Sequence, residues 1–80
     1  MTKRIVVLKE RWCFIGEWHA ATKTVPAYLT DASCIRIWGT SAGLGEIALK
    51  GPTKNTKLDY CGTIVVEKDA LLFSLLCTYK

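Results

Sequence analysis

Residues 4–18 read RIVVLKERWCFIGEW, and this stretch is the clearest β-strand signal in the chain. Its first half is rich in β-branched and apolar residues, which favours a β-strand. In its second half, spacing by two places Trp12, Phe14 and Trp18 on one face of a further strand. The opposite face is also largely apolar, as expected when one side of a strand meets the core and the other a neighbouring element. The chain is therefore predicted to begin with two consecutive strands, with a bend or bulge at Gly16.

The rest of the chain predicts three more strands and one short helix. Residues 19–30 are polar and contain Pro26, which indicates a loop. The glycine-framed stretch 39–51 has room for only one or two helical turns, capped by Thr40 or Ser41. We expect strands at residues 4–10, 11–18, 31–38, 58–67 and 70–78.

The last two strands each carry a specific expectation. Gly62 is expected to interrupt the strand at 58–67. Residues 70–77 are almost entirely apolar and predict a well-buried strand, with a helix as the alternative. The elements together predict a mainly β, small α+β fold, with about five antiparallel strands in a compact sheet or small barrel and one short helix after the third strand. The length allows a single domain, residues 1–80.

The composition predicts a self-associating protein. Half of the 80 residues are hydrophobic and only 22% are charged, so we expect a second subunit to cover part of the apolar surface in a homo-oligomer. The net charge of +4 permits phosphate-bearing partners but is small for a nucleic-acid-binding protein. No apolar stretch reaches the roughly 20 residues that span a bilayer. No membrane association is expected, and the absence of a signal peptide predicts the cytoplasm.

The four cysteines predict neither a metal site nor a redox motif. Cys13, Cys34, Cys61 and Cys77 lie far apart in the sequence, without the close pair that a zinc site or a redox motif uses. We expect reduced, core-filling thiols, with disulfides as the alternative, and no cofactor.

The glycine-rich region from Trp38 to Lys57 is the expected ligand site. Glycines let a backbone approach a ligand closely and leave amide hydrogens free to meet an anion. Lys50, Lys54 and Lys57 follow the glycines with no acid among them, and Arg36 lies two residues before the indole of Trp38. The expected ligand-binding residues are Arg36, Trp38, Gly39, Thr40, Ser41, Gly43, Gly45, Lys54, Thr56 and Lys57. The spacing matches neither the dinucleotide fingerprint nor the P-loop, and the alternative is a glycine-rich turn packed against a strand.

Catalysis is not expected. The lone His19 lies in the predicted loop with no cysteine or serine partner at a recognisable spacing, and a solvated surface histidine is the simpler interpretation. The aromatic face that bears Trp12, Phe14 and Trp18 is a candidate surface for docking on a host or viral protein, with core or subunit packing as the alternative.

Residues 34–66, CIRIWGTSAGLGEIALKGPTKNTKLDYCGTIVV, resemble a family of small phage and prophage proteins in which WGT, GLGE and GPT recur in this order before a strand. Here the motifs are Trp38–Thr40, Gly43–Glu46 and Gly51–Thr53. The resemblance implies a viral accessory protein in the cytoplasm of a bacterial host. Small non-enzymatic phage proteins often counter host defences by sequestering a nucleotide signal or by blocking a defence protein.

Three hypotheses follow. The first is a phage-encoded oligomer that captures a small nucleotide-like signal, with Trp38 stacking and with Arg36 and Lys54 or Lys57 meeting phosphates. The second is a protein-interaction module that inhibits a host or viral protein through its aromatic face. The third is a single-stranded nucleic-acid binder that uses the same aromatics and lysines, which the modest charge supports least.

Overall fold

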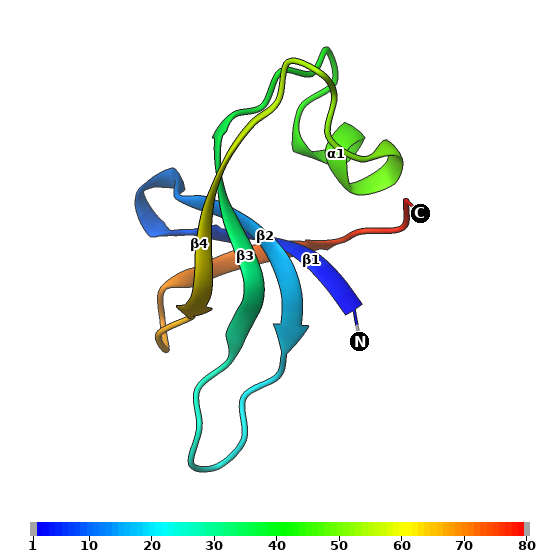
Figure 1. The fold of residues 1–80 in the computed structure, drawn as a ribbon. Helices are drawn as coiled ribbons and strands as arrows, with labels where there is room; N and C mark the ends of the chain where they lie inside the picture. Colours follow the sequence, from blue (N-terminus) through cyan, green and yellow to red (C-terminus); the bar gives the residue numbers. More distant parts are fainter. Residues whose placement is uncertain (1, 80) are drawn as a thin grey trace.

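The computed structural model describes residues 2–79 and contains one five-stranded antiparallel sheet and one short α-helix after the third strand (Figure 1). The predicted fold class is thereby confirmed. A 3-10 turn, η1 (Lys9–Arg11), joins the first two strands. The other elements are β1 (Thr2–Leu8), β2 (Cys13–His19), β3 (Tyr28–Ile37), α1 (Leu44–Lys50), β4 (Lys57–Val65) and β5 (Leu71–Leu76).

The strand order is β4-β3-β2-β1-β5, so β1 lies inside the sheet and β4 and β5 form its two edges. β1 forms antiparallel backbone hydrogen bonds with β2 along one edge and with β5 along the other. A strand whose two faces are both covered requires apolar side chains that point to either side of the sheet. The run of β-branched residues that predicted the first strand meets this requirement, since Ile5, Val6 and Val7 are all buried.

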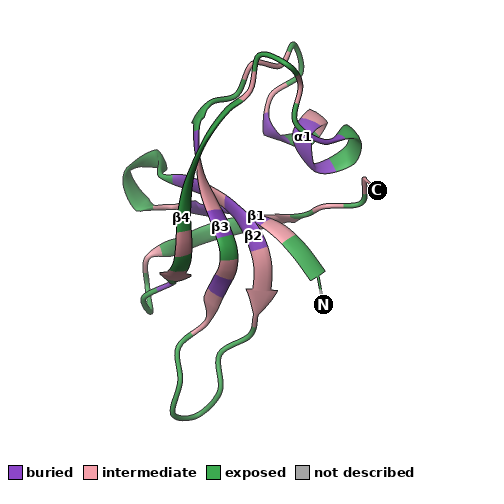
Figure 2. Ribbon diagram, viewed as in Figure 1, coloured by how far each residue is buried: buried purple, intermediate pink, exposed green. Residues whose placement is uncertain are grey.

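Alternation along β1 divides these side chains between two apolar clusters. Ile5 and Val7 belong to a cluster on one face, together with Ile15 of β2. Val6 belongs to the cluster on the other face, where it meets Leu29 of β3. Figure 2 shows the buried residues gathered at the centre of the sheet and on the underside of α1, whereas β4 is almost wholly exposed.

Helix α1 covers the first of these clusters. Leu44, Ile47 and Ala48 are buried against it. The backbone N–H of Thr78 donates to the carbonyl of Ala48 at 2.8 Å, which ties the segment after β5 to the helix. The helix begins after Gly43 as its N-cap, so the expectation that Thr40 or Ser41 would cap it was wrong.

Two glycines interrupt the strand pairing, as expected. The register between β2 and β3 shifts at Gly16, where a Cβ would lie 2.9 Å from the Thr30 carbonyl oxygen. The register between β3 and β4 shifts next to the pair formed by Ala32 and Gly62. Both shifts are β-bulges or irregularities of the ladder, which increase the local twist of the sheet.

The third strand begins earlier than the sequence indicated. Tyr28 and Leu29 lie in the stretch expected to be a loop, yet they pair with His19 and Trp18 of β2. The rings of His19 and Tyr28 stack with centroids 4.4 Å apart, and His19 Nε2 is 3.0 Å from Thr30 Oγ1. His19 is therefore a half-buried member of the ladder, and its expected role as a solvated surface residue was wrong.

The last strand is a strand and not a helix, but it is not well buried. Leu72, Phe73 and Leu76 are each more than half exposed. An apolar sequence does not reveal whether a strand lies at the centre or at the edge of a sheet, and β5 lies at an edge. Among residues 2–79, no helix is long and apolar enough to cross a membrane.

A paired substitution tests the burial of Ile5 on one face of β1. Ile5→Ala removes a fully buried side chain and should lower the free energy of unfolding by about 2–5 kcal/mol. Ile37→Ala removes the same atoms from a half-exposed side chain at the end of β3 and should cost less than about 1 kcal/mol. Urea denaturation followed by circular dichroism measures both, and equal losses would contradict this assignment of the core.

Candidate functional site

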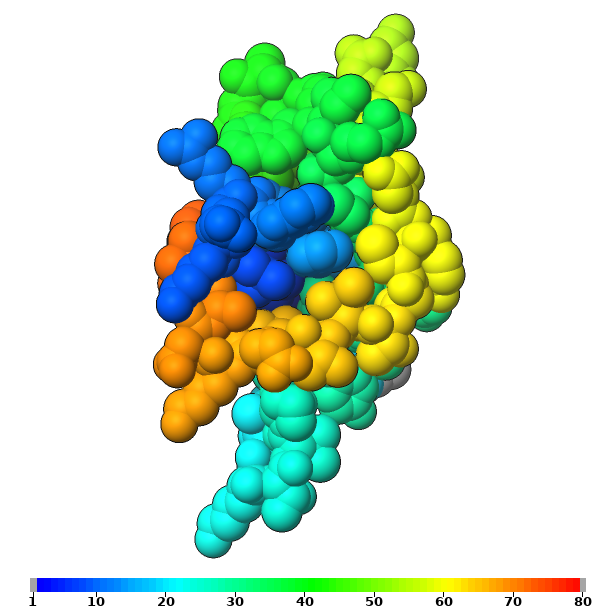
Figure 3. Space-filling view, turned by 90° about the vertical axis from the view of Figure 1, so that its left-hand side faces the viewer, coloured from blue at the N-terminus to red at the C-terminus, as the bar shows by residue number. Residues whose placement is uncertain are grey.

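A cavity of about 680 Å³ opens at one end of the sheet, between the β2–β3 loop and the connection from β4 to β5. We call it the loop cavity. Figure 3 shows the tip of the β2–β3 loop projecting at the bottom of the molecule, with the β4–β5 connection directly above it. The cavity is lined by Trp18, residues 21–27, residues 66–69 and Leu71.

Backbone pairing explains why these two loops meet. Tyr28 at the start of β3 pairs with Val65 at the end of β4, so the loops that flank this pair lie at the same end of the sheet. The N–H of Val66 extends the contact by donating to the Ala27 carbonyl at 2.8 Å. Val66 is buried, and it anchors the second loop against the first.

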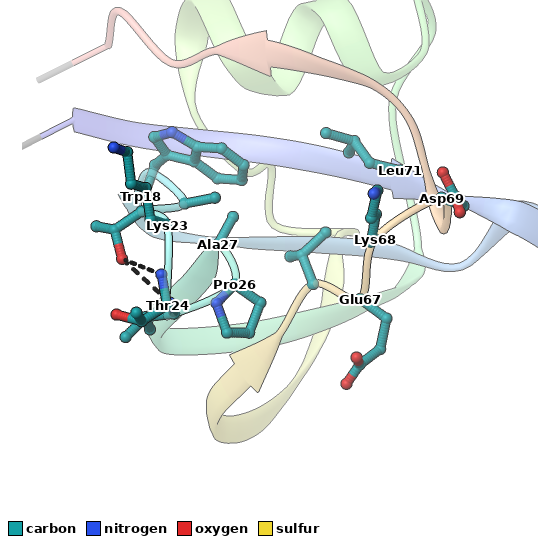
Figure 4. Close-up of a pocket in the computed structure, with 13 residues that line it drawn as sticks. Trp18, Lys23, Thr24, Pro26, Ala27, Glu67, Lys68, Asp69 and Leu71 are labelled. Atoms are coloured by element: carbon teal, nitrogen blue, oxygen red, sulfur yellow. Dashed lines mark hydrogen bonds between the residues drawn. The ribbon is translucent and has the colours of Figure 1, made fainter.

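The β2–β3 loop is held in a compact turn by Thr22. Its N–H donates to the Val25 carbonyl at 2.8 Å. Its hydroxyl oxygen accepts from the N–H groups of Thr24 and Val25 at 3.3 and 3.1 Å (Figure 4). A threonine hydroxyl commonly organises a turn in this way, and the result is a loop with a defined shape on one side of the cavity.

Trp18 forms the aromatic wall of the loop cavity. It comes from β2, pairs with Leu29 of β3 and packs against the cluster that contains Val6. The guanidinium of Arg4 lies 5.1 Å from the centre of the Trp18 ring, within cation–π range. Arg4 Nη1 also donates to Ser74 Oγ at 3.4 Å, while its buried Nε has no hydrogen-bond partner in the described part of the chain.

Charged side chains surround this apolar wall. Lys23 comes from the first loop, and Glu67, Lys68 and Asp69 come from the second. In Figure 4 the Trp18 indole and Leu71 lie along one side of the cavity, and Glu67 points away from them. The cavity thus combines a flat aromatic surface with two lysines, and the cation of Arg4 lies close to the ring.

The residues expected to bind a ligand lie at the other end of β3. Several of them form hydrogen bonds or an ion pair with other residues of the chain. Arg36 Nε forms an ion pair with Asp59 Oδ2 at 2.8 Å, with both side chains more than half exposed. Trp38 follows β3, is 45% exposed and lies beside Gly43. Lys54 and Lys57 are exposed.

Several donors of the glycine-rich loop are used within the loop and its helix. The Glu46 carboxylate accepts from the Ala42 N–H at 3.1 Å and from the Ser41 hydroxyl at 3.2 Å. The Thr40 hydroxyl oxygen accepts from the Gly43 N–H at 2.9 Å and donates to the Gly43 carbonyl at 3.0 Å. An incoming anion would have to displace the Glu46 carboxylate to reach the Ala42 N–H and the Ser41 hydroxyl.

Two threonines join the first and last motifs of the glycine-rich region. The Thr53 hydroxyl donates to the Gly39 carbonyl at 2.7 Å, and the Thr56 hydroxyl donates to the Trp38 carbonyl at 2.6 Å. The Thr53 N–H in turn donates to Thr56 Oγ1 at 2.9 Å. This threonine clasp, formed by Thr53 and Thr56, holds the segment before α1 against the segment after it.

The predicted aromatic face does not form one continuous exposed surface. Phe14 and Trp18 pack against the cluster around Val6. Trp12 lies outside the strands, is 57% exposed and lines a second cavity of about 440 Å³ together with Arg36. Arg36 and Trp12 therefore line the same cavity, whereas the sequence paired Arg36 with Trp38.

The cysteines are all free thiols, and their burial differs. Burial raises the pKa of the Cys13, Cys34 and Cys77 thiols. For Cys34 the nearby Cys61 raises the pKa further. A raised pKa keeps a thiol protonated at neutral pH and limits its reactivity. Cys61 is exposed, so the expectation of core-filling thiols was wrong for this residue.

Sequence reasoning missed the loop cavity because its two loops are far apart in the chain and contain no motif. The signal that could have located it is the register of β3 against β4, which the sequence pattern does not specify. Among residues 2–79, no group of three or more His, Cys, Asp or Glu side chains lies together as a metal ion would need. No family model, no curated protein and no solved structure matches this chain.

A series of glycine substitutions tests the packing around the clasp. Gly39 has φ +64°, and an added Cβ would lie 2.3 Å from the Asn55 carbonyl carbon. Gly39→Ala should therefore cost more than the roughly 1 kcal/mol of backbone strain alone. Gly62 also has a positive φ, so Gly62→Ala strains the backbone, but no atom lies near the added Cβ. Gly45→Ala in α1 causes neither backbone strain nor a clash.

Chemical denaturation should rank the three variants by free energy of unfolding, with Gly39→Ala the least stable. Gly45→Ala should equal or exceed the parent protein, because alanine favours helix by up to about 1 kcal/mol over glycine. A Gly39→Ala variant as stable as Gly62→Ala would show that the two segments are not in close contact.

Proposed function

We propose that this protein is a non-enzymatic binding module that captures a small nucleotide-derived ligand in the loop cavity. The observation that carries the proposal is the aromatic wall of Trp18 in a cavity of about 680 Å³. Small-molecule sites usually have volumes of roughly 300–1,000 Å³ and mostly apolar walls with a few polar groups. The loop cavity has these properties.

The side chains around the cavity favour a ligand with a flat base and an anionic group. An indole ring offers a stacking surface for any base. Lys23 and Lys68 supply ammonium groups at the rim, and each can bind a phosphate as a point charge. Arg4 holds a further positive charge next to the ring. The acids Glu67 and Asp69 would oppose a highly charged ligand, so the proposal favours one or two phosphates.

The biological setting belongs to the same proposal. Residues 34–66 resemble small phage and prophage proteins, so we place this module among phage-type accessory proteins that act in the cytoplasm of a bacterial host. Capture of a nucleotide-derived immune signal would protect the phage without any chemical step, because a ligand held in a cavity cannot reach its receptor. The number of protein copies would then have to match the number of signal molecules.

Charge reversal in the loop cavity tests the site. A thermal-shift panel of cyclic dinucleotides and ADP-ribose should raise the melting temperature of the parent protein, since a ligand stabilises the state that binds it. Lys68→Glu should weaken binding at least ~10-fold, because a charged hydrogen bond contributes about 1.5–3 kcal/mol. Lys50→Glu makes the same change of charge on an exposed residue of α1 and should leave the affinity unchanged.

The same assay separates the loop cavity from the glycine-rich region. Lys54→Glu should bind like the parent protein if the ligand lies at Trp18, and should lose affinity if it lies at Trp38. Native mass spectrometry of protein from bacteria with an active nucleotide-signalling defence gives an independent measurement. A releasable mass of a nucleotide is expected, and an empty protein together with a flat thermal-shift panel would refute the proposal.

A further inference from the structure

The two edges of the sheet differ in how well they are protected against pairing with another chain. An edge strand presents a row of unpaired N–H and C=O groups, and natural proteins usually protect such edges with charges, prolines or bulges. β4 contains Lys57 and Asp59 and has several register shifts against β3. β5 reads LLFSLL and contains no charged residue and no proline.

The hydrogen-bonding groups of β5 alternate between its neighbour and the open edge. The N–H of Cys77 donates to the Lys3 carbonyl of β1 at 2.9 Å. In an antiparallel pair every second residue bonds to the neighbouring strand. Because the register runs without a shift from Phe73 to Leu76, the backbone groups of Ser74 and Leu76 point away from β1.

The side chains at this edge are large, apolar and exposed. Leu72, Phe73 and Leu76 are each more than half exposed, and Leu71 is 36% exposed. The pairing of β5 with β1 shifts by one residue, so that Leu72 has no Cα partner. Unpaired backbone groups and exposed apolar side chains thus occur together along one strand.

We propose that β5 pairs antiparallel with β5 of a second copy of this chain, about a two-fold axis near Ser74, so that two sheets join into one. The sequence of the strand suits this occupant, because it reads almost the same in both directions. Leu76 would face Leu72 of the partner subunit, and Phe73 would face Leu75 of the partner subunit. β5 itself contains no charged residue, so no like charges would meet within the strand pair, although each copy carries a net charge of +4 and Arg4 lies beside Ser74, with its Nη1 3.4 Å from Ser74 Oγ.

The alternative heterologous contact, β5 against β4 of the next copy, is less favourable. It would place the apolar strand against Lys57 and Asp59 and against a strand whose pairing is irregular. A head-to-tail contact of this kind also builds rings or filaments, whereas a two-fold contact closes as a dimer. The predicted homo-oligomer is therefore a dimer joined through β5, and this inference is independent of the ligand proposed above.

Sedimentation velocity tests the dimer. At about 100 µM chain, where even an interface of small area populates the complex, the parent protein should sediment as a dimer. Leu76→Lys places a charge at the edge and should give a monomer. Ser74→Pro removes an N–H that points away from β1, so it should also give a monomer while the β1–β5 pairing persists.

A matched control places the same charge elsewhere. Leu49→Lys changes a leucine of α1 that is 64% exposed, and this variant should remain a dimer. Circular dichroism should show the parent spectrum and a cooperative melt for each variant. A monomeric parent protein, a dimer that survives both edge substitutions, or an assembly larger than two copies would overturn the proposal.

Discussion

Burial of β1 on both of its faces is the constraint on which the rest of the structure depends. Ile5 and Val7 lie in one apolar cluster and Val6 lies in the other, so β1 contributes buried side chains to both faces of the sheet. β1 pairs with β2 on one side and with β5 on the other, and α1 covers the first cluster. β5 pairs with β1 and forms one edge of the sheet. Its apolar side chains face solvent.

The same sheet separates two regions with different roles. At one end, the glycine-rich region is closed on itself by the threonine clasp and by the Glu46 carboxylate. These contacts give the three motifs structural roles: Thr53 of GPT bonds Gly39 of WGT across α1, and Glu46 of GLGE bonds the loop before the helix. At the other end, the loop cavity combines the Trp18 indole with lysines whose charges meet no partner within the loops. The second arrangement is the better suited to accept a ligand.

The sequence predicted the elements well and their surroundings poorly. The β-branched residues Ile5, Val6 and Val7 predicted a strand, and Gly16 and Gly62 predicted irregular pairing, because these features depend on local backbone and side-chain preferences. The exposure of Phe73 and the formation of the loop cavity depend instead on strand order and register. These are set by contacts between distant residues, which the pattern of residues along the chain does not reveal.

In the proposed function, the ligand binds at Trp18 and not at Trp38. The chain contains three tryptophans, so a two-dimensional ¹⁵N–¹H spectrum of the labelled protein offers one indole N–H signal for each. Titration with cyclic dinucleotides and with ADP-ribose should move the Trp18 signal and leave those of Trp12 and Trp38 in place. Movement of the Trp38 signal with a stationary Trp18 signal would contradict the account and would place the ligand in the glycine-rich region.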